Sequence, residues 1–154
     1  MKKFLLYLIF ICLVTFAKVQ ISSAQLNLCS WNTTTQFNTP RFSFSSVTYN
    51  GYLYVIGGTN NGITSFNDVQ YAQINANGSL GTWRTTTSFN SGRYGQTSVA
   101  YNGYLYIIGG NVNGTGANDV QYAQINSNGS LGTWQFTTSF NTGRWSHSSV
   151  VYNG

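Results

Sequence analysis

Three arginines recur at nearly constant spacing along the chain, and each is followed by an aromatic residue. Such pairs suit anionic or sugar ligands, because a guanidinium forms forked hydrogen bonds and an aromatic ring offers a face for stacking. If they begin the first strand of successive units, they converge on one surface. The alternative is structural: a hydrogen bond from arginine to a carbonyl of the neighbouring unit, repeated with the fold. The candidate binding residues are Arg41, Arg93, Tyr94, Arg144 and Trp145.

The remaining titratable groups give weaker indications of chemistry. His147 is the single histidine, and a catalytic or metal-binding histidine needs partners that no carboxylate cluster supplies here. Asp68 and Asp119 each follow an asparagine, which favours hydrogen bonding at a turn or strand end over calcium binding by six or more oxygens. We therefore predict no catalytic residue, no metal and no cofactor.

The chain repeats itself at intervals of 52 and 51 residues. Tryptophan recurs at positions 31, 83 and 134, and the triplet "YNG" begins at Tyr49, Tyr101 and Tyr152. The stretch "NDVQYAQINANGSLGTW" from Asn67 returns from Asn118 with one change. A period of this length is typical of solenoids, propellers and other repeat arrays.

Each unit reads as four short strands. "SSVTYNGYLYVIGG" is two strands joined at Asn50-Gly51, the strongest local signal for a tight hairpin. "DVQYAQIN" is a third strand and "TWRTTT" a fourth. The abundance of Thr, Val, Tyr, Ile and Phe disfavours helix. We expect an all-β chain in which each unit is a four-stranded antiparallel meander.

The strand "YLYVI" is apolar on both faces. Tyr52, Tyr54 and Ile56 point to one side and Leu53 and Val55 to the other, so the sheet must be covered twice. Stacking the units on one another achieves this, and the radial form of such a stack is a β-propeller with four-stranded blades. The predicted fold class is therefore a partial β-propeller.

A glycine pair ends this strand in both units. Glycine there allows a backbone dihedral barred to other residues, or close approach of a neighbouring backbone or ring. The predicted motif residues are Gly57, Gly58, Tyr71 and Trp83 in the first unit, and Gly109, Gly110, Tyr122 and Trp134 in the second, with the tyrosines and tryptophans as candidates for the approaching ring.

An apolar strand ending in a glycine pair, a tyrosine thirteen positions later and then a tryptophan resembles a kelch repeat. The resemblance covers Arg41 to Trp134 as two copies, and the long gap from Tyr71 to Trp83 is most similar to a secreted bacterial kelch-like subtype. It implies four-stranded kelch-type blades whose loops contact a partner.

The N-terminal stretch is expected to direct secretion. Lys2 and Lys3 precede an apolar run from Phe4 to Phe16, which is shorter than the roughly 20 residues that cross a bilayer, and small residues follow at Ser22 to Ala24. Cleavage there leaves Cys29 as the one cysteine, which excludes an internal disulfide. The predicted organisation is a signal peptide (1–24), a fourth-type strand with linker (25–40), repeat 1 (41–92), repeat 2 (93–143) and the start of a third repeat (144–154).

About two and a half units cannot close a ring, since propellers have about four blades or more. Leu26 to Thr35, which carries Trp31, resembles the N-terminal strand that completes the last blade of many kelch-like propellers. We therefore expect a fragment of a longer protein. The alternatives are a ring completed by several chains and self-association through open sheet faces.

These features predict a secreted or surface-exposed binding module that contacts protein or carbohydrate through its blade loops. The charged residues are few and scattered, which argues against nucleic acid as a partner. We predict no enzymatic activity and no membrane span after signal cleavage. One alternative is the non-catalytic portion of a secreted enzyme that resembles galactose oxidase; another is a structural or adhesive surface repeat.

Overall fold

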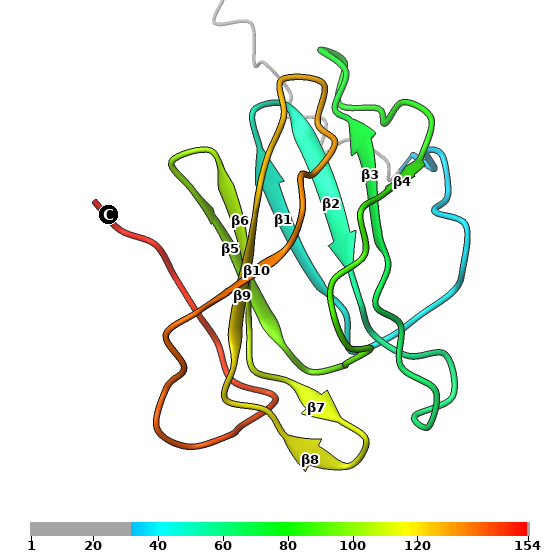
Figure 1. Cartoon of the computed structure of the whole chain (residues 1–154). Coiled ribbons are helices and arrows are strands. Elements are labelled where there is room, and N and C mark those ends of the chain that lie inside the picture. Colours follow the sequence, from blue (N-terminus) through cyan, green and yellow to red (C-terminus); the bar gives the residue numbers. More distant parts are fainter. Residues whose placement is uncertain (1–31, 154) are drawn as a thin grey trace, which may run out of the picture. The chain divides into compact units, whose positions relative to one another are not determined.

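A computed structural model describes residues 32–153. All of the elements below lie within residues 33–153. The predicted signal peptide, Trp31 and most of the predicted strand from Leu26 lie outside the described residues. The strands, labelled in Figure 1, are β1 (Ser45–Tyr49), β2 (Tyr52–Ile56), β3 (Val69–Gln73), β4 (Arg84–Thr86), β5 (Thr97–Tyr101), β6 (Tyr104–Ile108), β7 (Asn111–Val112), β8 (Thr115–Gly116), β9 (Val120–Gln124) and β10 (Gln135–Thr137).

The strands form two equivalent four-stranded sheets. The first has the order β1-β2-β3-β4 and the second β5-β6-β9-β10, with every neighbouring pair antiparallel. This confirms the predicted all-β fold with meander units, and residues 32–153 form no closed ring. None of the described residues belongs to a helix that could cross a membrane.

The tight hairpins form where the Asn-Gly pairs predict them. Asn50 and Gly51 have φ of 47° and 79°, and Asn102 and Gly103 have 47° and 82°. Positive φ at both central residues is the geometry of the turn that matches strand twist. It fixes the register so that Tyr49 pairs with Tyr52.

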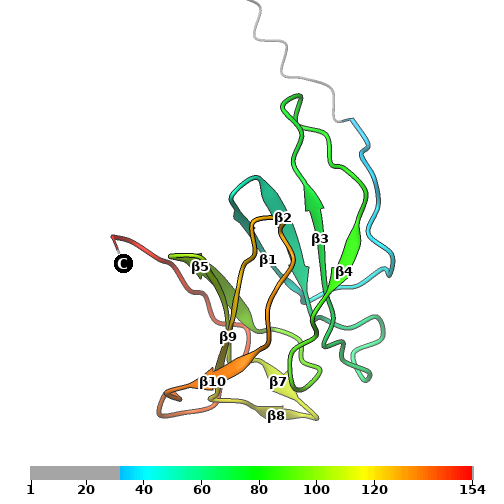
Figure 2. The same ribbon diagram turned by 45° about the horizontal axis from the view of Figure 1, so that its top comes forward.

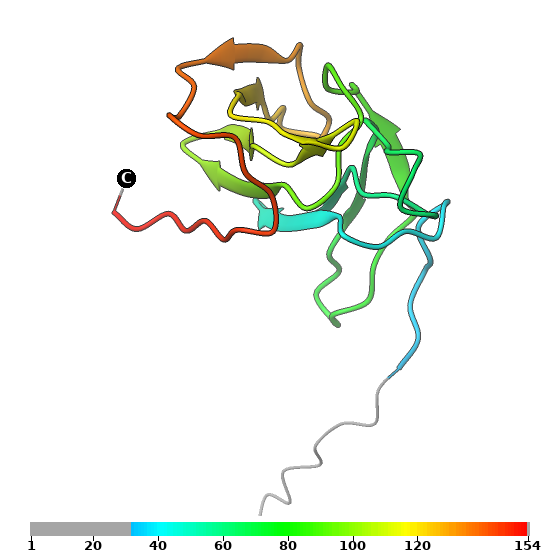
Figure 3. The same ribbon diagram turned by 90° about the horizontal axis from the view of Figure 1, so that it is seen from below.

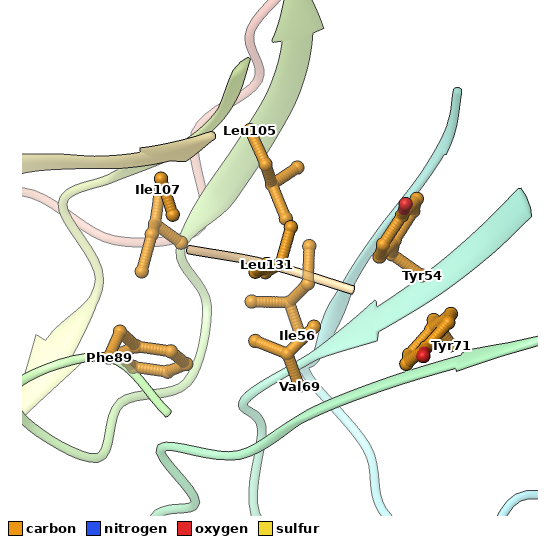
Figure 4. Close-up of a cluster of buried hydrophobic side chains, with 9 residues drawn as sticks. Tyr54, Ile56, Val69, Tyr71, Phe89, Leu105, Ile107 and Leu131 are labelled. Carbon is orange, nitrogen blue, oxygen red and sulfur yellow. The ribbon is translucent and has the colours of Figure 1, made fainter. Parts of the chain in front are cut away.

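The two sheets stack through unlike faces. Alternation along the strands gives each sheet what we call a tyrosine face (Tyr54, Ile56, Val69 and Tyr71 in the first) and a leucine face (Leu105, Ile107, Ala123 and Leu131 in the second). All eight of these residues are buried in one cluster, where the tyrosine face of the first sheet packs on the leucine face of the second (Figure 4). β1 lies beside β5 in the same stack (Figures 2 and 3).

The glycine pairs are required for both predicted reasons, but the approaching groups differ from those predicted. Gly57 and Gly58 have φ of 58° and 91°. A Cβ on Gly57 would lie 2.9 Å from the Arg93 carbonyl oxygen and 3.1 Å from the Phe89 ring. The groups nearest to Gly57 therefore come from the loop that leads into the second sheet, and those nearest to Gly58 are Phe42 and Phe44, before β1. Neither Tyr71 nor Trp83 is among them.

The tryptophans anchor the segment that precedes each sheet. Trp134 Nε1 donates to the Thr87 carbonyl, just after β4, at 2.9 Å. Trp83 Nε1 makes the same bond to the Thr35 carbonyl at 2.9 Å. The described residues 32–35 are not assigned to a strand, and residues 26–31 of the predicted strand lie outside the described residues, so that strand stays a prediction. Thr34 and Thr35 nevertheless bond to the first sheet in the same way as Thr86 and Thr87, at the end of β4, bond to the second sheet.

Candidate functional site

Arg41 and Arg93 were predicted to begin the first strand of their units, but they lie in the loops before β1 and β5, several residues before these strands begin. Arg41 donates to the Gly57 carbonyl at 2.8 Å and to both carboxylate oxygens of Asp68 at 2.6 and 2.9 Å. The glycine directly follows β2 and the aspartate directly precedes β3, so the arginine joins three segments of one sheet. Its side chain is 1% exposed.

Arg93 repeats this arrangement in the second sheet with Gly109 and Asp119. The structural alternative to ligand binding was a hydrogen bond from each arginine to a carbonyl of the neighbouring unit. Both arginines donate to a carbonyl, but this carbonyl belongs to their own sheet. The carboxylate partner was missed. A signal was available, because each Arg is followed by an Asp at 26 or 27 residues, and a guanidinium fork matches a carboxylate.

The two carboxylates are held in the charged form. Burial alone raises the pKa of Asp119, but hydrogen bonds from Arg93 and Gln121 and the charge of Arg93 outweigh it and keep the pKa below its ordinary value of 3.8. Asp68 shows the same balance, with burial opposed by Arg41 and Gln70, and its pKa is also lowered. The ion pairs therefore stabilise the fold rather than provide acid–base chemistry.

Arg144 differs from its two equivalents. It is exposed, and its Nε donates to the Thr142 carbonyl at 3.2 Å. Its guanidinium lies 5.3 Å from the centre of the Phe140 ring. Among residues 32–153 it has no carboxylate partner.

The aromatic residues after the first two arginines, Phe42 and Tyr94, are more accessible than Arg41 and Arg93. Phe42 and Trp145 are exposed, and Tyr94 is half-buried at the edge of a depression of about 370 Å³. The predicted set is therefore not brought together, since only Tyr94 lines this hollow. The lining residues are Gly62, Ile63, Ser65, Tyr94, Asn111, Asn113 and Gly114.

Two hydrogen-bonded loops build the depression. One connects β2 to β3, where Asn61 Oδ1 accepts from the backbone N–H groups of Ile63 and Thr64 at 2.9 and 2.8 Å. The other is the β7–β8 hairpin, where Asn111 Oδ1 accepts from the Gly114 N–H at 2.8 Å. This hairpin was not predicted, although Asn113-Gly114 is the same turn signal as at the long hairpins.

The depression presents apolar, hydroxyl and amide groups, and the residues that line it include no Asp, Glu, His, Cys, Lys or Arg. Ile63 at its rim is 86% exposed. His147 lies elsewhere and packs on Phe140; burial, followed by the charge of Arg144, lowers its pKa. The described part of the chain contains no group of three or more His, Cys, Asp or Glu side chains that could hold a metal ion. The chemistry available at the depression is recognition by contact and hydrogen bonding.

A comparison with protein families matches residues 40–71 to the Kelch motif. The matched range contains Arg41, the glycine pair after β2, Asp68 and Tyr71, which are the residues that organise the first sheet. A comparison with curated proteins gives no match. Residues 40–71 thus carry a Kelch motif, and the two four-stranded antiparallel sheets of the described residues form a partial kelch-type propeller.

Proposed function

We propose that this chain is an interaction module that holds a partner protein at the depression beside Tyr94. A kelch motif is typical of propeller modules that bind proteins, and loops carried on a rigid scaffold are the usual place for such contacts. The observation that carries the proposal is the exposed Ile63 side chain above a hollow lined by Tyr94, Asn111 and Asn113.

The composition of this surface suits a protein interface. Tyrosine is enriched at interface hot spots, and an exposed aliphatic residue gains free energy when it is covered. The exposed amide of Asn113 supplies a donor and an acceptor for a peptide backbone. Because side chain to backbone hydrogen bonds hold both loops, little conformational entropy is lost on binding.

A carbohydrate is the second candidate ligand. Tyr94 and the amide of Asn113 lie in the same depression, and an aromatic face beside planar polar groups suits a sugar ring. The enzyme-related and adhesive alternatives from the sequence stay predictions. We also propose that the chain is secreted, which the charged and apolar N-terminal sequence supports. N-terminal sequencing of the exported protein tests this, and the first residue found should be Gln25.

Panning a random peptide library and a glycan array against the full chain tests the binding proposal. The variant Tyr94→Ala should bind the selected peptides at least about thirtyfold more weakly, since a hot-spot tyrosine contributes about 2 kcal/mol or more. Phe136→Ala is the matched control, because Phe136 is 57% exposed and lies outside the depression.

Selection of glycans alone would favour the second ligand class. Peptide binding that Tyr94→Ala leaves unchanged would overturn the site, and selection of neither class would overturn the function. Both variants should unfold at the temperature of the original chain, which separates lost binding from lost folding.

A further inference from the structure

The two sheets leave complementary faces incompletely covered. On the leucine face of the first sheet, Leu53 and Leu80 are half-buried, while Val55 and Trp83 are buried against Phe37 and Phe44. The tyrosine face of the first sheet is buried, but its equivalents in the second sheet, Tyr106, Ile108, Val120 and Tyr122, are only half-buried. A depression of about 320 Å³ lies over this face. On the first sheet the leucine face carries a depression of about 620 Å³, lined by Leu53, Val55 and Trp83 among others. The contact between the two sheets shows that a tyrosine face fits a leucine face.

The segment that would extend the stack is present in the chain. Residues 144–153, "RWSHSSVVYN", match residues 41–50, "RFSFSSVTYN", at seven of ten positions. In residues 41–50 this sequence forms β1, paired with β2. In residues 144–153 it forms no strand, and Val150 and Tyr152 are 86% and 83% exposed.

The residues that precede segments 41–50 and 144–153 are equivalent as well. Thr34 Oγ1 accepts from the Leu80 N–H at 2.8 Å, and Thr86 Oγ1 accepts from the Leu131 N–H at 2.7 Å. In sequence, Thr137 corresponds to both threonines. The stretch from Thr137 into the third repeat therefore carries the threonine and arginine that bond to the first sheet from residues 34–41, while His147 stands in place of Phe44.

We propose that residues 144–153 of one copy replace residues 41–50 in the first sheet of a second copy. The incoming strand lies antiparallel to β2 in the register of β1, so that Val150 faces Tyr54 and Tyr152 faces Tyr52. Arg144 then reaches Asp68, which Arg41 has released. The first sheet of the second copy becomes the third sheet of the stack, with its leucine face on the uncovered tyrosine face of the first copy.

The energetic balance favours this exchange. The backbone hydrogen bonds of the replaced strand are lost and reformed in the same register, so they nearly cancel. Burial of Val150 and Tyr152 replaces that of Val47 and Tyr49, which pack on the same cluster before the exchange, so the net gain is burial of Tyr106 and Ile108. A further bond becomes available, because Tyr54 donates to the Gly129 carbonyl and the equivalent pair across copies is Tyr106 and Gly78. The contact is head-to-tail, so it gives either closed rings or open chains.

Disulfide trapping tests the register. With Cys12 and Cys29 replaced by serine, the variant Leu53→Cys/Val151→Cys should form dimers and larger species linked by disulfides. The matched control is Thr48→Cys/Leu53→Cys, which should close within one copy because Thr48 pairs with Leu53 in β1–β2. A trapping variant that stays monomeric on a non-reducing gel, while the control closes, would overturn the proposal.

Light scattering of the full chain gives a second readout. The molar mass should rise with concentration, and Val150→Asp should return it to the monomer value without changing the melting temperature of the monomer. Association that persists in Val150→Asp, or a monomer at every concentration, would contradict the exchange. Tyr94→Ala should leave association unchanged, so this proposal and the proposed function can fail separately.

Discussion

Arg93 and Asp119 form a two-point ion pair, with nitrogen–oxygen distances of 2.8 and 3.0 Å, beneath the loop that carries Tyr94. The guanidinium is almost fully buried and also donates to the Gly109 carbonyl. Three segments that are distant in sequence therefore share one charged group. The same triangle in the first blade, formed by Arg41, Gly57 and Asp68, indicates that the repeat is built around it.

Replacement of Arg93 by alanine should lower the free energy of unfolding by about 3–5 kcal/mol, because it leaves the Asp119 carboxylate without its partner. Arg84→Ala is the control: Arg84 is exposed and has no ion pair within residues 32–153, so a change below about 0.5 kcal/mol is expected. Urea unfolding followed by tryptophan fluorescence measures both. Equal stability of the two variants would refute the structural role, and unchanged melting with lost ligand binding would instead support a binding role for Arg93.

Stability should fall in acid through the two aspartates. Their folded-state pKa values lie below 3.8, so the unfolded chain takes up protons first as the pH drops. The contribution of the two aspartates to the free energy of unfolding is therefore complete above the ordinary pKa. It is lost as the pH falls through the folded-state pKa. His147 causes a separate loss of stability below pH 6.5, because its pKa is lowered in the folded chain and the unfolded chain therefore takes up this proton first. The experiment is done in a His147→Gln background, which removes this loss.

The matched variant for this experiment is Asp68→Asn/Asp119→Asn. It should be less stable at neutral pH and should show no such decrease in acid. Denaturant unfolding at a series of pH values gives the comparison, and an unchanged acid decrease in this variant would assign the effect to other groups.

The sequence predicted the parts of the fold that depend on local pattern. Asn50-Gly51 specifies its hairpin by dihedral preference alone, and the alternation in "YLYVI" specifies a sheet covered on both sides. What lies against the glycine pair was not predictable, because it depends on how the loop with Phe89 crosses the end of β2. The Arg93–Asp119 pair, in contrast, has a signal in the 26-residue spacing, and the meander brings these two residues together. The depression at Tyr94 combines loops of both blades, so neither repeat alone contains it.

The glycine pair allows steric crowding to be separated from backbone preference. Gly57→Ala should lose about 1 kcal/mol from its positive φ and a further 1–3 kcal/mol, roughly, from the clash with the Arg93 carbonyl. Gly103→Ala has a similar positive φ of 82° but no neighbouring atom within 4 Å, so only the first loss is expected. Urea unfolding of the two variants should therefore differ, and equal losses would show that the close approach has no energetic effect.

Tyr54 and Tyr106 occupy equivalent positions on the tyrosine faces of the two blades, and they should respond differently to loss of the hydroxyl. Tyr54 is fully buried and donates to the Gly129 carbonyl at 2.9 Å, so Tyr54→Phe removes a bond that joins the blades and leaves a buried acceptor unpaired. We expect a loss of about 1–2 kcal/mol. Burial, together with the neighbouring Tyr52 and Tyr71, also raises the pKa of Tyr54, so this hydroxyl should stay protonated in alkaline solution where exposed tyrosines ionise.

Tyr106→Phe is the matched change on the uncovered face. The Tyr106 hydroxyl has no hydrogen-bond partner among the described residues, so unfolding of the monomeric Val150→Asp chain should change by less than about 0.5 kcal/mol. In the chain that can exchange strands, the same substitution removes the expected bond to Gly78 of the next copy and should shift association to higher concentration. Equal destabilisation by Tyr54→Phe and Tyr106→Phe in the monomer would mean that stacking of the second blade on the first does not depend on the Tyr54–Gly129 bond.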